Sequence, residues 1–109
     1  MDKMGEIADL QKLIEDFANE RDWAKYHTAK NLALALGSEV GELQAEFRWL
    51  SESENISGEK ITNIRNEIAD VGIFLLRLAD VLGIDLNEAI KNKLVLNQMR
   101  NNSGPDFIK

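Results

Sequence analysis

The sequence is distinguished first by the residue types that it lacks. Its 109 residues include no cysteine, one proline and one histidine. Without cysteine there is no disulfide framework, no thiolate metal site and no cysteine nucleophile. The single proline is Pro105, and no segment shows sustained alternation of apolar and polar residues. Both observations favour an all-α fold.

Positive charge and long apolar runs are also scarce. The formal net charge is -6, whereas a general nucleic-acid binder carries a basic excess or stripe, so we expect no nucleic-acid partner. The longest apolar stretches are far too short for a membrane span, and the first residues lack a long apolar signal region. We therefore expect a soluble, cytoplasmic protein without membrane contact. Such an acidic chain can still bind an anionic substrate if a metal ion supplies positive charge.

The length and the apolar spacing predict one helical domain over residues 1–109, with 1–5 and 101–109 frayed. Apolar residues recur at helical spacing in four segments, 7–20, 29–50, 59–82 and 86–100. From Ile61 to Leu82 they alternate steps of three and four, which is typical of near-antiparallel bundle packing. We expect N-caps at Thr28 and Asp85, and Gly83 just after the third helix. The predicted architecture is an antiparallel four-helix bundle.

Two short acidic pairs lie on neighbouring predicted helices. The second helix carries Glu39 and Glu42, and the third carries Glu67 and Asp70. Helix residues three apart share a face, so each pair directs two carboxylates the same way at the edge of an apolar seam. Carboxylates about 4 Å apart repel by roughly 4 kcal/mol at an effective dielectric near 20, and a divalent cation removes that repulsion. An oxygen-only ligand set suits Mg²⁺ or Mn²⁺ better than Zn²⁺.

The pairs therefore indicate a Mg²⁺ site between two helices that acts on a phosphate substrate. Either pair alone would be interpreted as solvated surface, and it is their joint position beside apolar seams that favours a metal. A non-catalytic helical interaction module remains an alternative. A carboxylate-bridged di-iron bundle needs Glu-x-x-His pairs, and the only histidine, His27, lies outside any such pair.

Taken in order, these motifs resemble the MazG-like family of all-α nucleoside triphosphate pyrophosphatases. The family hallmark is E-x-x-E, a spacer, and E-x-x-D on the following helix, as in the two acidic pairs. The segment 17–27 (FANERDWAKYH), the Asn31-Leu32 pair, Trp49 and the segment 93–97 resemble the small dCTP pyrophosphatase branch. The likeness extends over about 7–100. One E-x-x-E is a weak motif, whereas the ordered set is specific.

This resemblance implies hydrolysis of a nucleoside triphosphate to the monophosphate and pyrophosphate, with Mg²⁺ as cofactor and Mn²⁺ able to substitute. It implies that Glu39, Glu42, Glu67 and Asp70 hold the metal and carry catalysis. The family forms dimers that often pair into tetramers. We accordingly expect a homo-oligomer, and favour a tetramer over a dimer.

The resemblance also implies which residues bind the substrate. The candidates around the nucleoside and phosphates are His27, Trp23, Asn31, Trp49, Phe74, Lys93, Asn97 and Arg100. Two positions depart from the dCTP-hydrolysing branch, which has a histidine at Ile14 and a tyrosine at Phe74. We expect dCTP or a related pyrimidine deoxynucleotide as substrate, with a broader base preference than in that branch. Trp49 also suits a bundle end, and Arg100 suits a plain helix C-terminal cation.

Overall fold

The computed structural model describes residues 5–100. This part of the chain is all-helical, without strands, as predicted. Its elements in order are α1 (Glu6–Glu20), the 3₁₀ helix η1 (Ala24–Tyr26), α2 (Ala29–Ala45), α3 (Gly58–Val81) and α4 (Leu86–Met99). The expected fraying of 1–4 and 101–109 lies outside the described residues, whereas Gly5 accepts a hydrogen bond from the Asp9 N–H as the N-cap of α1.

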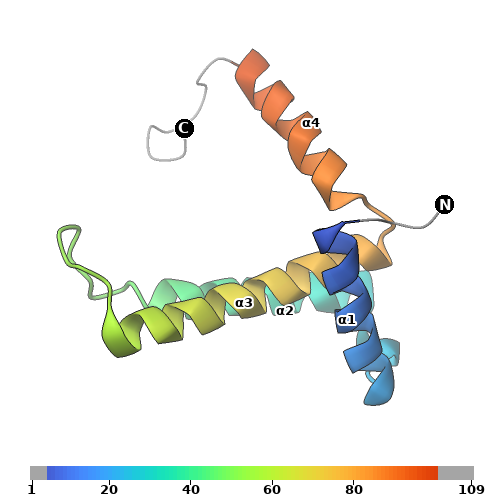
Figure 1. The fold of residues 1–109 in the computed structure, drawn as a ribbon, viewed down its shortest axis with the longest axis horizontal. Coiled ribbons are helices and arrows are strands. Elements are labelled where there is room, and N and C mark those ends of the chain that lie inside the picture. The colour runs from blue at the N-terminus through green and yellow to red at the C-terminus, as the bar shows by residue number, and fades with distance from the viewer. Residues whose placement is uncertain (1–4, 101–109) are drawn as a thin grey trace.

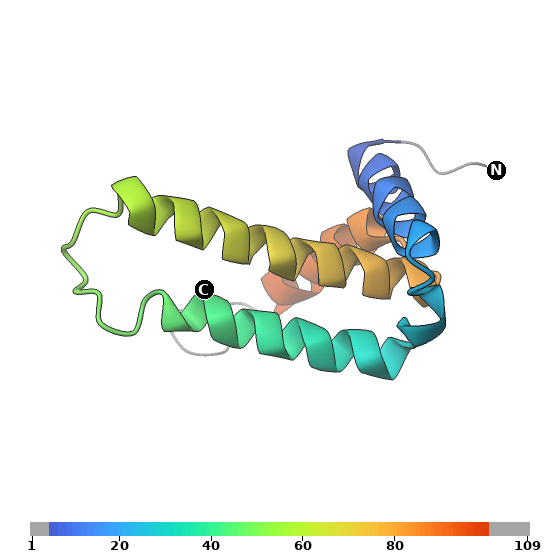
Figure 2. The same ribbon diagram turned by 90° about the horizontal axis from the view of Figure 1, so that it is seen from below.

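Two of the helices form a long antiparallel pair. Figure 1 and Figure 2 show α2 and α3 side by side over most of their length, and this is the most extensive contact between elements. The helix α1 crosses α3 near the C-terminal end of α3. The helix α4 points away from the pair (Figure 1). No helix among residues 5–100 combines the length and the apolar character that crossing a bilayer requires.

The predicted helix caps are confirmed. The Thr28 side chain accepts a hydrogen bond from the Asn31 N–H at 3.2 Å. The Asp85 carboxylate accepts one from the Glu88 N–H at 3.1 Å. Gly83 has a φ of 68°, the left-handed conformation that glycine adopts without a Cβ clash. These local signals define where α2 begins and where α3 gives way to α4.

The second helix ends earlier than predicted, at Ala45 rather than at residue 50. The N–H groups that follow bond to carbonyls three residues back, which tightens the chain into turns; these residues are Glu46, Phe47 and Arg48. Lys60 at the start of α3 donates to the Glu46 carbonyl at 3.1 Å and so satisfies one of the terminal acceptors of α2. Trp49 consequently lies beyond α2, and its predicted place within a helix extending to residue 50 is wrong.

A polar contact helps to hold α1 against α3. Gln11 is 4% exposed, and its amide nitrogen donates to the Leu76 carbonyl of α3 at 3.0 Å. Among the described residues the buried apolar ones are few, and two of the four are alanines: Ala18, Leu32, Ile64 and Ala79. A core of this size leaves much of the apolar surface of one protomer uncovered.

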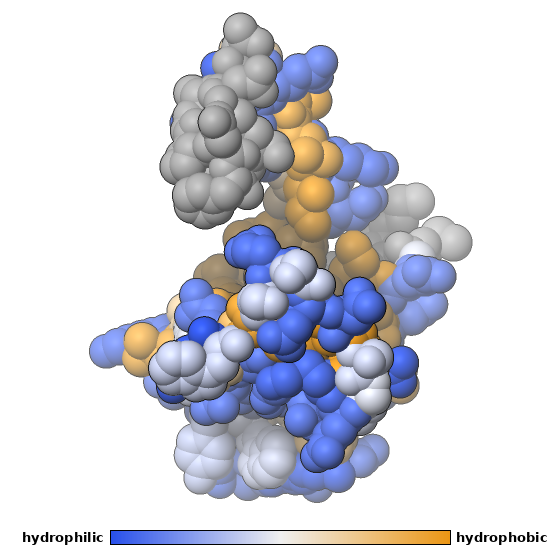
Figure 3. Space-filling model, turned by 90° about the vertical axis from the view of Figure 1, so that its left-hand side faces the viewer, coloured by the Kyte–Doolittle hydropathy of each residue, from blue (hydrophilic) through white to orange (hydrophobic). Residues whose placement is uncertain are grey.

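The uncovered apolar surface follows a regular pattern on α3. Residues of the predicted seam that lie seven apart are exposed by 41%, 55%, 38% and 53% in turn, namely Ile61, Ile68, Leu75 and Leu82. We call these four residues the exposed stripe. On α4, which is exposed from residue 87 onward, the expected inner residues Ile90 and Leu94 are 49% and 62% exposed. Figure 3 shows apolar surface along this projecting limb. One protomer therefore does not confirm the predicted four-helix bundle.

Candidate active site

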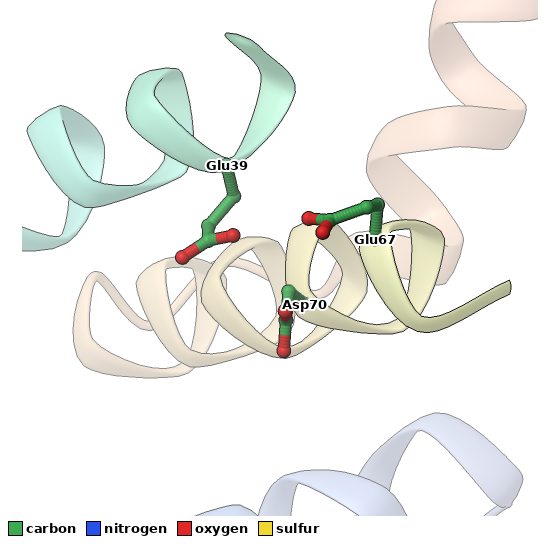
Figure 4. Close-up of side chains that lie close together, drawn as sticks. All are labelled: Glu39, Glu67 and Asp70. Carbon is green, nitrogen blue, oxygen red and sulfur yellow. The ribbon is translucent and has the colours of Figure 1, made fainter. Parts of the chain in front are cut away.

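Three of the four predicted metal ligands come together between α2 and α3. Glu39 on α2 and Glu67 and Asp70 on α3 each place a carboxylate oxygen within 4.8 Å of the others. Figure 4 shows Glu39 reaching from α2 towards α3, where Glu67 turns to meet it. All three are half-buried. The antiparallel pairing of the two helices thus converts two motifs 28 residues apart into one acidic cluster.

The electrostatics of this cluster fit a bound cation. The pKa of Glu67 is raised above its ordinary value of 4.5, first by loss of hydration and then by neighbouring negative charge; the contributing carboxylates are Asp70, Glu39, Glu42 and Glu46. Glu42 is exposed and outside the three-residue cluster, but its charge still acts on Glu67. Mg²⁺ or Mn²⁺ would relieve this repulsion, because both ions prefer oxygen ligands.

The raised pKa gives a first testable prediction about stability without metal. Because folding raises the pKa of Glu67, the folded protein binds more protons than the unfolded chain between pH 4.5 and the higher folded pKa. The contribution of Glu67 to stability therefore falls as the pH rises through this window. We expect Glu67→Gln to flatten that part of the curve of urea midpoint against pH, measured with EDTA, and Glu20→Gln to leave it unchanged. A curve for Glu67→Gln identical to that of the wild type would contradict the assignment.

The predicted nucleoside-binding residues lie at opposite ends of α2. Trp23, His27 and Asn31 lie around its start, while Trp49 follows its end. The 17 residues of α2 correspond to about 25 Å of helix. Within one protomer, therefore, the structure does not bring His27 and Trp49 into a common pocket. Trp49 is 89% exposed, so packing within one protomer does not explain this side chain.

Around the start of α2, hydrogen bonds and ring contacts order the connector, which we define as residues 21–28 between α1 and α2. The Asn31 side chain donates to the Tyr26 carbonyl at 3.0 Å. Trp23 meets the ring of Phe17 edge-on at 5.7 Å between centroids, and the Arg21 guanidinium lies 3.4 Å from the Phe17 centroid. Such aromatic and cation–π contacts stabilise the connector although its rings are partly exposed.

The remaining predicted residues are placed by α3 and α4. Phe74 is half-buried, one turn beyond Asp70 on α3. Lys93, Asn97 and Arg100 are exposed and belong to the limb formed by α4 and its C-cap. That limb points away from the α2–α3 pair (Figure 1), so one protomer does not place these three residues at its own carboxylate cluster.

Sequence reasoning missed two cations that the structure connects to this region. Lys60 contacts Glu46 at the end of α2, with a 3.4 Å ion pair in addition to the carbonyl contact. Arg77 is 7% exposed and donates to His27. The signal for Arg77 was present in the sequence, because a cation between Leu76 and Leu78 interrupts an apolar seam.

Comparison with known proteins identifies the family. No family model matches the chain. A crystal structure of a pyrophosphatase from Archaeoglobus fulgidus superimposes with a TM-score of 0.79 at 34% sequence identity, covering 94% of this chain and 98% of that one. The chain belongs to the MazG-like family of all-α nucleoside triphosphate pyrophosphatases.

Curated relatives agree with this MazG-like membership. Human dCTP pyrophosphatase 1 is 37% identical over 98 residues, 86% of this chain and 58% of the human protein. A dATP/dGTP diphosphohydrolase of Salmonella phage PMBT28 is 30% identical over 96 residues, 88% of this chain and 28% of the phage protein. The chain thus spans little more than half the length of the human relative. The two relatives are named for nucleotides with different bases, so membership of the family does not determine which nucleotide is the substrate.

Proposed function

We propose that this protein is a Mg²⁺-dependent hydrolase that converts a deoxynucleoside triphosphate to the monophosphate and pyrophosphate. The observation that carries the proposal is the convergence of Glu39, Glu67 and Asp70 between α2 and α3. It is supported by the family, whose members include a dCTP pyrophosphatase and a dATP/dGTP diphosphohydrolase. A non-catalytic interaction module would not require half-buried carboxylates gathered so closely that their charges raise the pKa of Glu67.

The chemistry follows from the charges. Mg²⁺, when bound, would neutralise charge that develops on the phosphate oxygens. Glu39, Glu67 and Asp70 would hold it, with Glu42 one turn from Glu39 on the same helix face as a fourth ligand. A carboxylate of the cluster would also orient the attacking water, and Glu39 is the candidate because of its place in the family motif. We infer that water attacks the α-phosphorus and that pyrophosphate leaves, which gives the monophosphate and pyrophosphate in one step.

Product analysis tests this proposal directly. Hydrolysis in ¹⁸O-labelled water should release pyrophosphate in one step and leave the label on the monophosphate. Orthophosphate with a nucleoside diphosphate as first product would indicate another class of hydrolase. No product from any nucleotide at any Mg²⁺ or Mn²⁺ concentration would favour the interaction module.

Metal binding should also be visible without turnover. We expect Mg²⁺ to raise the melting temperature, because it binds the folded cluster and relieves the repulsion among its carboxylates. Glu39→Gln and Asp70→Asn should shrink that shift, and either change should stabilise the metal-free protein by removing repulsion. Differential scanning fluorimetry with and without Mg²⁺ measures both effects, with Glu20→Gln as the exposed control. Equal Mg²⁺ shifts in all four proteins would argue against the ligand set.

For the substrate we propose dCTP or a related pyrimidine deoxynucleotide, with a preference of only tenfold to a hundredfold, roughly, over other deoxynucleotides. An aromatic face such as Trp49 stacks on any base and contributes about 1 to 3 kcal/mol with little discrimination. Trp49→Ala should therefore weaken all substrates similarly. Asn97→Ala should flatten the ranking, because a lost buried hydrogen bond costs about 1 to 3 kcal/mol. Values of kcat/KM for dCTP, dTTP, dUTP and dATP measure this, and a strong purine preference in the wild type would exclude the pyrimidine assignment.

We further propose that the protein is a homo-oligomer, and we favour a tetramer over a dimer. The exposed stripe repeats every seven residues on α3, as expected of a helix that packs along a second helix. On α4, Leu94, Val95, Leu96 and Met99 are each more than half exposed. Assembly would bury both surfaces into the bundle predicted from the sequence. It would also allow α4 of one protomer, with Lys93 and Asn97, to approach the carboxylate cluster of another.

A further inference from the structure

A buried cation connects three parts of the fold. Arg77 on α3 is 7% exposed, and its Nε donates to Nδ1 of His27 at 3.1 Å. Its Nη1 lies 3.9 Å from a carboxylate oxygen of Glu15 on α1 and 3.9 Å from one of Asp80 on α3. A buried guanidinium requires compensation of this kind. The contact gives the imidazole of His27 a hydrogen-bond donor in a fixed position.

The contact specifies where the hydrogen of His27 is. A guanidinium carries only donors and stays protonated, so Nδ1 of His27 must accept and therefore bears no hydrogen. A neutral imidazole then carries its single hydrogen on Nε2. The pKa of His27 is lowered from its ordinary value of 6.5 by burial and by the charge of Arg77.

Other charged groups lie on each of the elements that meet at this contact. Glu15 comes from α1 and Asp80 from α3, both beside Arg77. Lys25 and Asp22, in the connector that contains His27, pair with each other at 2.9 Å. The two carboxylates lie 3.9 Å from Nη1 of Arg77, whereas burial and the charge of Arg77 disfavour a charge on the ring itself.

The contact also has a defined position relative to the carboxylate cluster. Arg77 lies seven residues after Asp70 on α3, which is two helical turns, or about 10 Å. That separation is comparable with the length of a nucleotide from its phosphates to its base. The place of Arg77 on α3 therefore suits a role for its partner ring at the nucleoside while the phosphates lie at the carboxylates.

We propose that Arg77 is a positioning residue that holds His27 as a neutral ring with one donor, Nε2–H, for an uncharged acceptor on the nucleoside. The inference rests on the proposed function. A neutral donor has no charge preference for phosphate, and the carbonyl O2 common to cytosine, thymine and uracil is an acceptor of the required kind. Reading O2 would serve the three pyrimidines alike, and would favour them over purines because a purine offers a ring nitrogen at that edge in place of the carbonyl.

The only histidine of the chain makes the test direct. Nitrogen-15 NMR of ¹⁵N-histidine-labelled, tag-free protein reports the tautomer and pKa of one imidazole. Arg77→Gln keeps a donor the same number of bonds from the backbone as Nε, while Arg77→Met keeps the length and has none. Arg65→Met, at an exposed position on the same helix, is the matched control.

In the wild type and in Arg65→Met, we expect one tautomer with hydrogen on Nε2 and a pKa below 6.5. Arg77→Met should give a tautomer mixture and a pKa that moves towards 6.5, and Arg77→Gln should retain the tautomer. The ratio of kcat/KM for dCTP over dATP should fall about tenfold in Arg77→Met, mainly through KM, and recover in Arg77→Gln.

Three results would overturn the inference: hydrogen on Nδ1 in the wild type, an unchanged tautomer in Arg77→Met, or an unchanged dCTP/dATP ratio in that variant. If Arg77→Met does not fold, the wild-type spectrum and the dCTP/dATP ratio of His27→Ala against His27→Gln, which retains a donor, decide the same question. Failure of the proposed function is recognised separately, because pyrophosphate release from every nucleotide would then be absent whatever tautomer the spectrum shows.

Discussion

Replacing Glu39, Glu67 or Asp70 by its amide should lower kcat for pyrophosphate release by about a hundredfold or more. Loss of a residue that merely supports a metal ligand typically costs 10- to 100-fold, so loss of a ligand itself should cost at least as much as the upper end of that range. The amide keeps the shape and removes the charge, and the three oxygens lie within 4.8 Å of one another. Initial rates at saturating substrate over a Mg²⁺ series measure the effect.

Two further variants make this result interpretable. Glu42→Gln should also abolish pyrophosphate release, because its carboxylate lies one turn from Glu39 and already influences the pKa of Glu67. Glu20→Gln, at a 74% exposed side chain, should retain wild-type activity. Full activity in Glu39→Gln and Asp70→Asn would remove the cluster from the mechanism, and full activity in Glu42→Gln alone would reduce the ligand set to three.

Disrupting the exposed stripe should dissociate the oligomer and remove most activity. The double variant Leu75→Glu/Leu82→Glu places two charges on positions that are 38% and 53% exposed in one protomer and buried in the proposed assembly. We expect light scattering to show a smaller particle than the wild type. kcat/KM should fall by about a hundredfold or more, since contacts to a charged group contribute about 1.5 to 3 kcal/mol each and α4 would no longer supply Lys93 to a neighbouring cluster.

The matched control for this variant is Thr62→Glu/Ala69→Glu, which adds two charges, also seven residues apart, to exposed positions of α3 outside the stripe. It should keep the wild-type mass and activity. Circular dichroism should show that both double variants retain their helices. A wild type that is monomeric at micromolar concentration would contradict the assembly, and an active dissociated variant would show that one protomer suffices for catalysis.

The sequence predicted those features that depend on neighbouring residues. Helix starts at Thr28 and Asp85 follow from side chains that bond to the N–H groups nearby, and these predictions are confirmed. The all-α content is likewise confirmed. The end of α2 was missed because a terminal turn held by i to i−3 bonds and by Lys60 depends on how α3 returns. Local sequence does not encode that tertiary contact.

The candidate site was likewise predicted where it depends on local spacing and missed where it depends on helix packing. Spacing of three on two helices predicted which carboxylates share a face, and the structure brings Glu39, Glu67 and Asp70 together. The nucleoside residues were assigned from resemblance, and their three-dimensional arrangement depends on helix packing that spacing does not describe. His27 and Trp49 lie at opposite ends of α2, and Arg77 contacts His27 across 50 positions of sequence. Contacts and separations between residues so far apart in the sequence become known only from the folded structure.

The antiparallel pairing of α2 and α3 has a kinetic consequence. The two helices follow one another in the sequence and are joined by residues 46–57 alone, which favours rapid formation of this hairpin over pairings of more distant segments. The acidic cluster would then be assembled early in folding, so that its mutual repulsion opposes the nucleus itself. An ion that occupies the cluster would in that case accelerate folding as well as slow unfolding. Formation of this one helical hairpin would then decide whether the chain binds the metal before or after it folds.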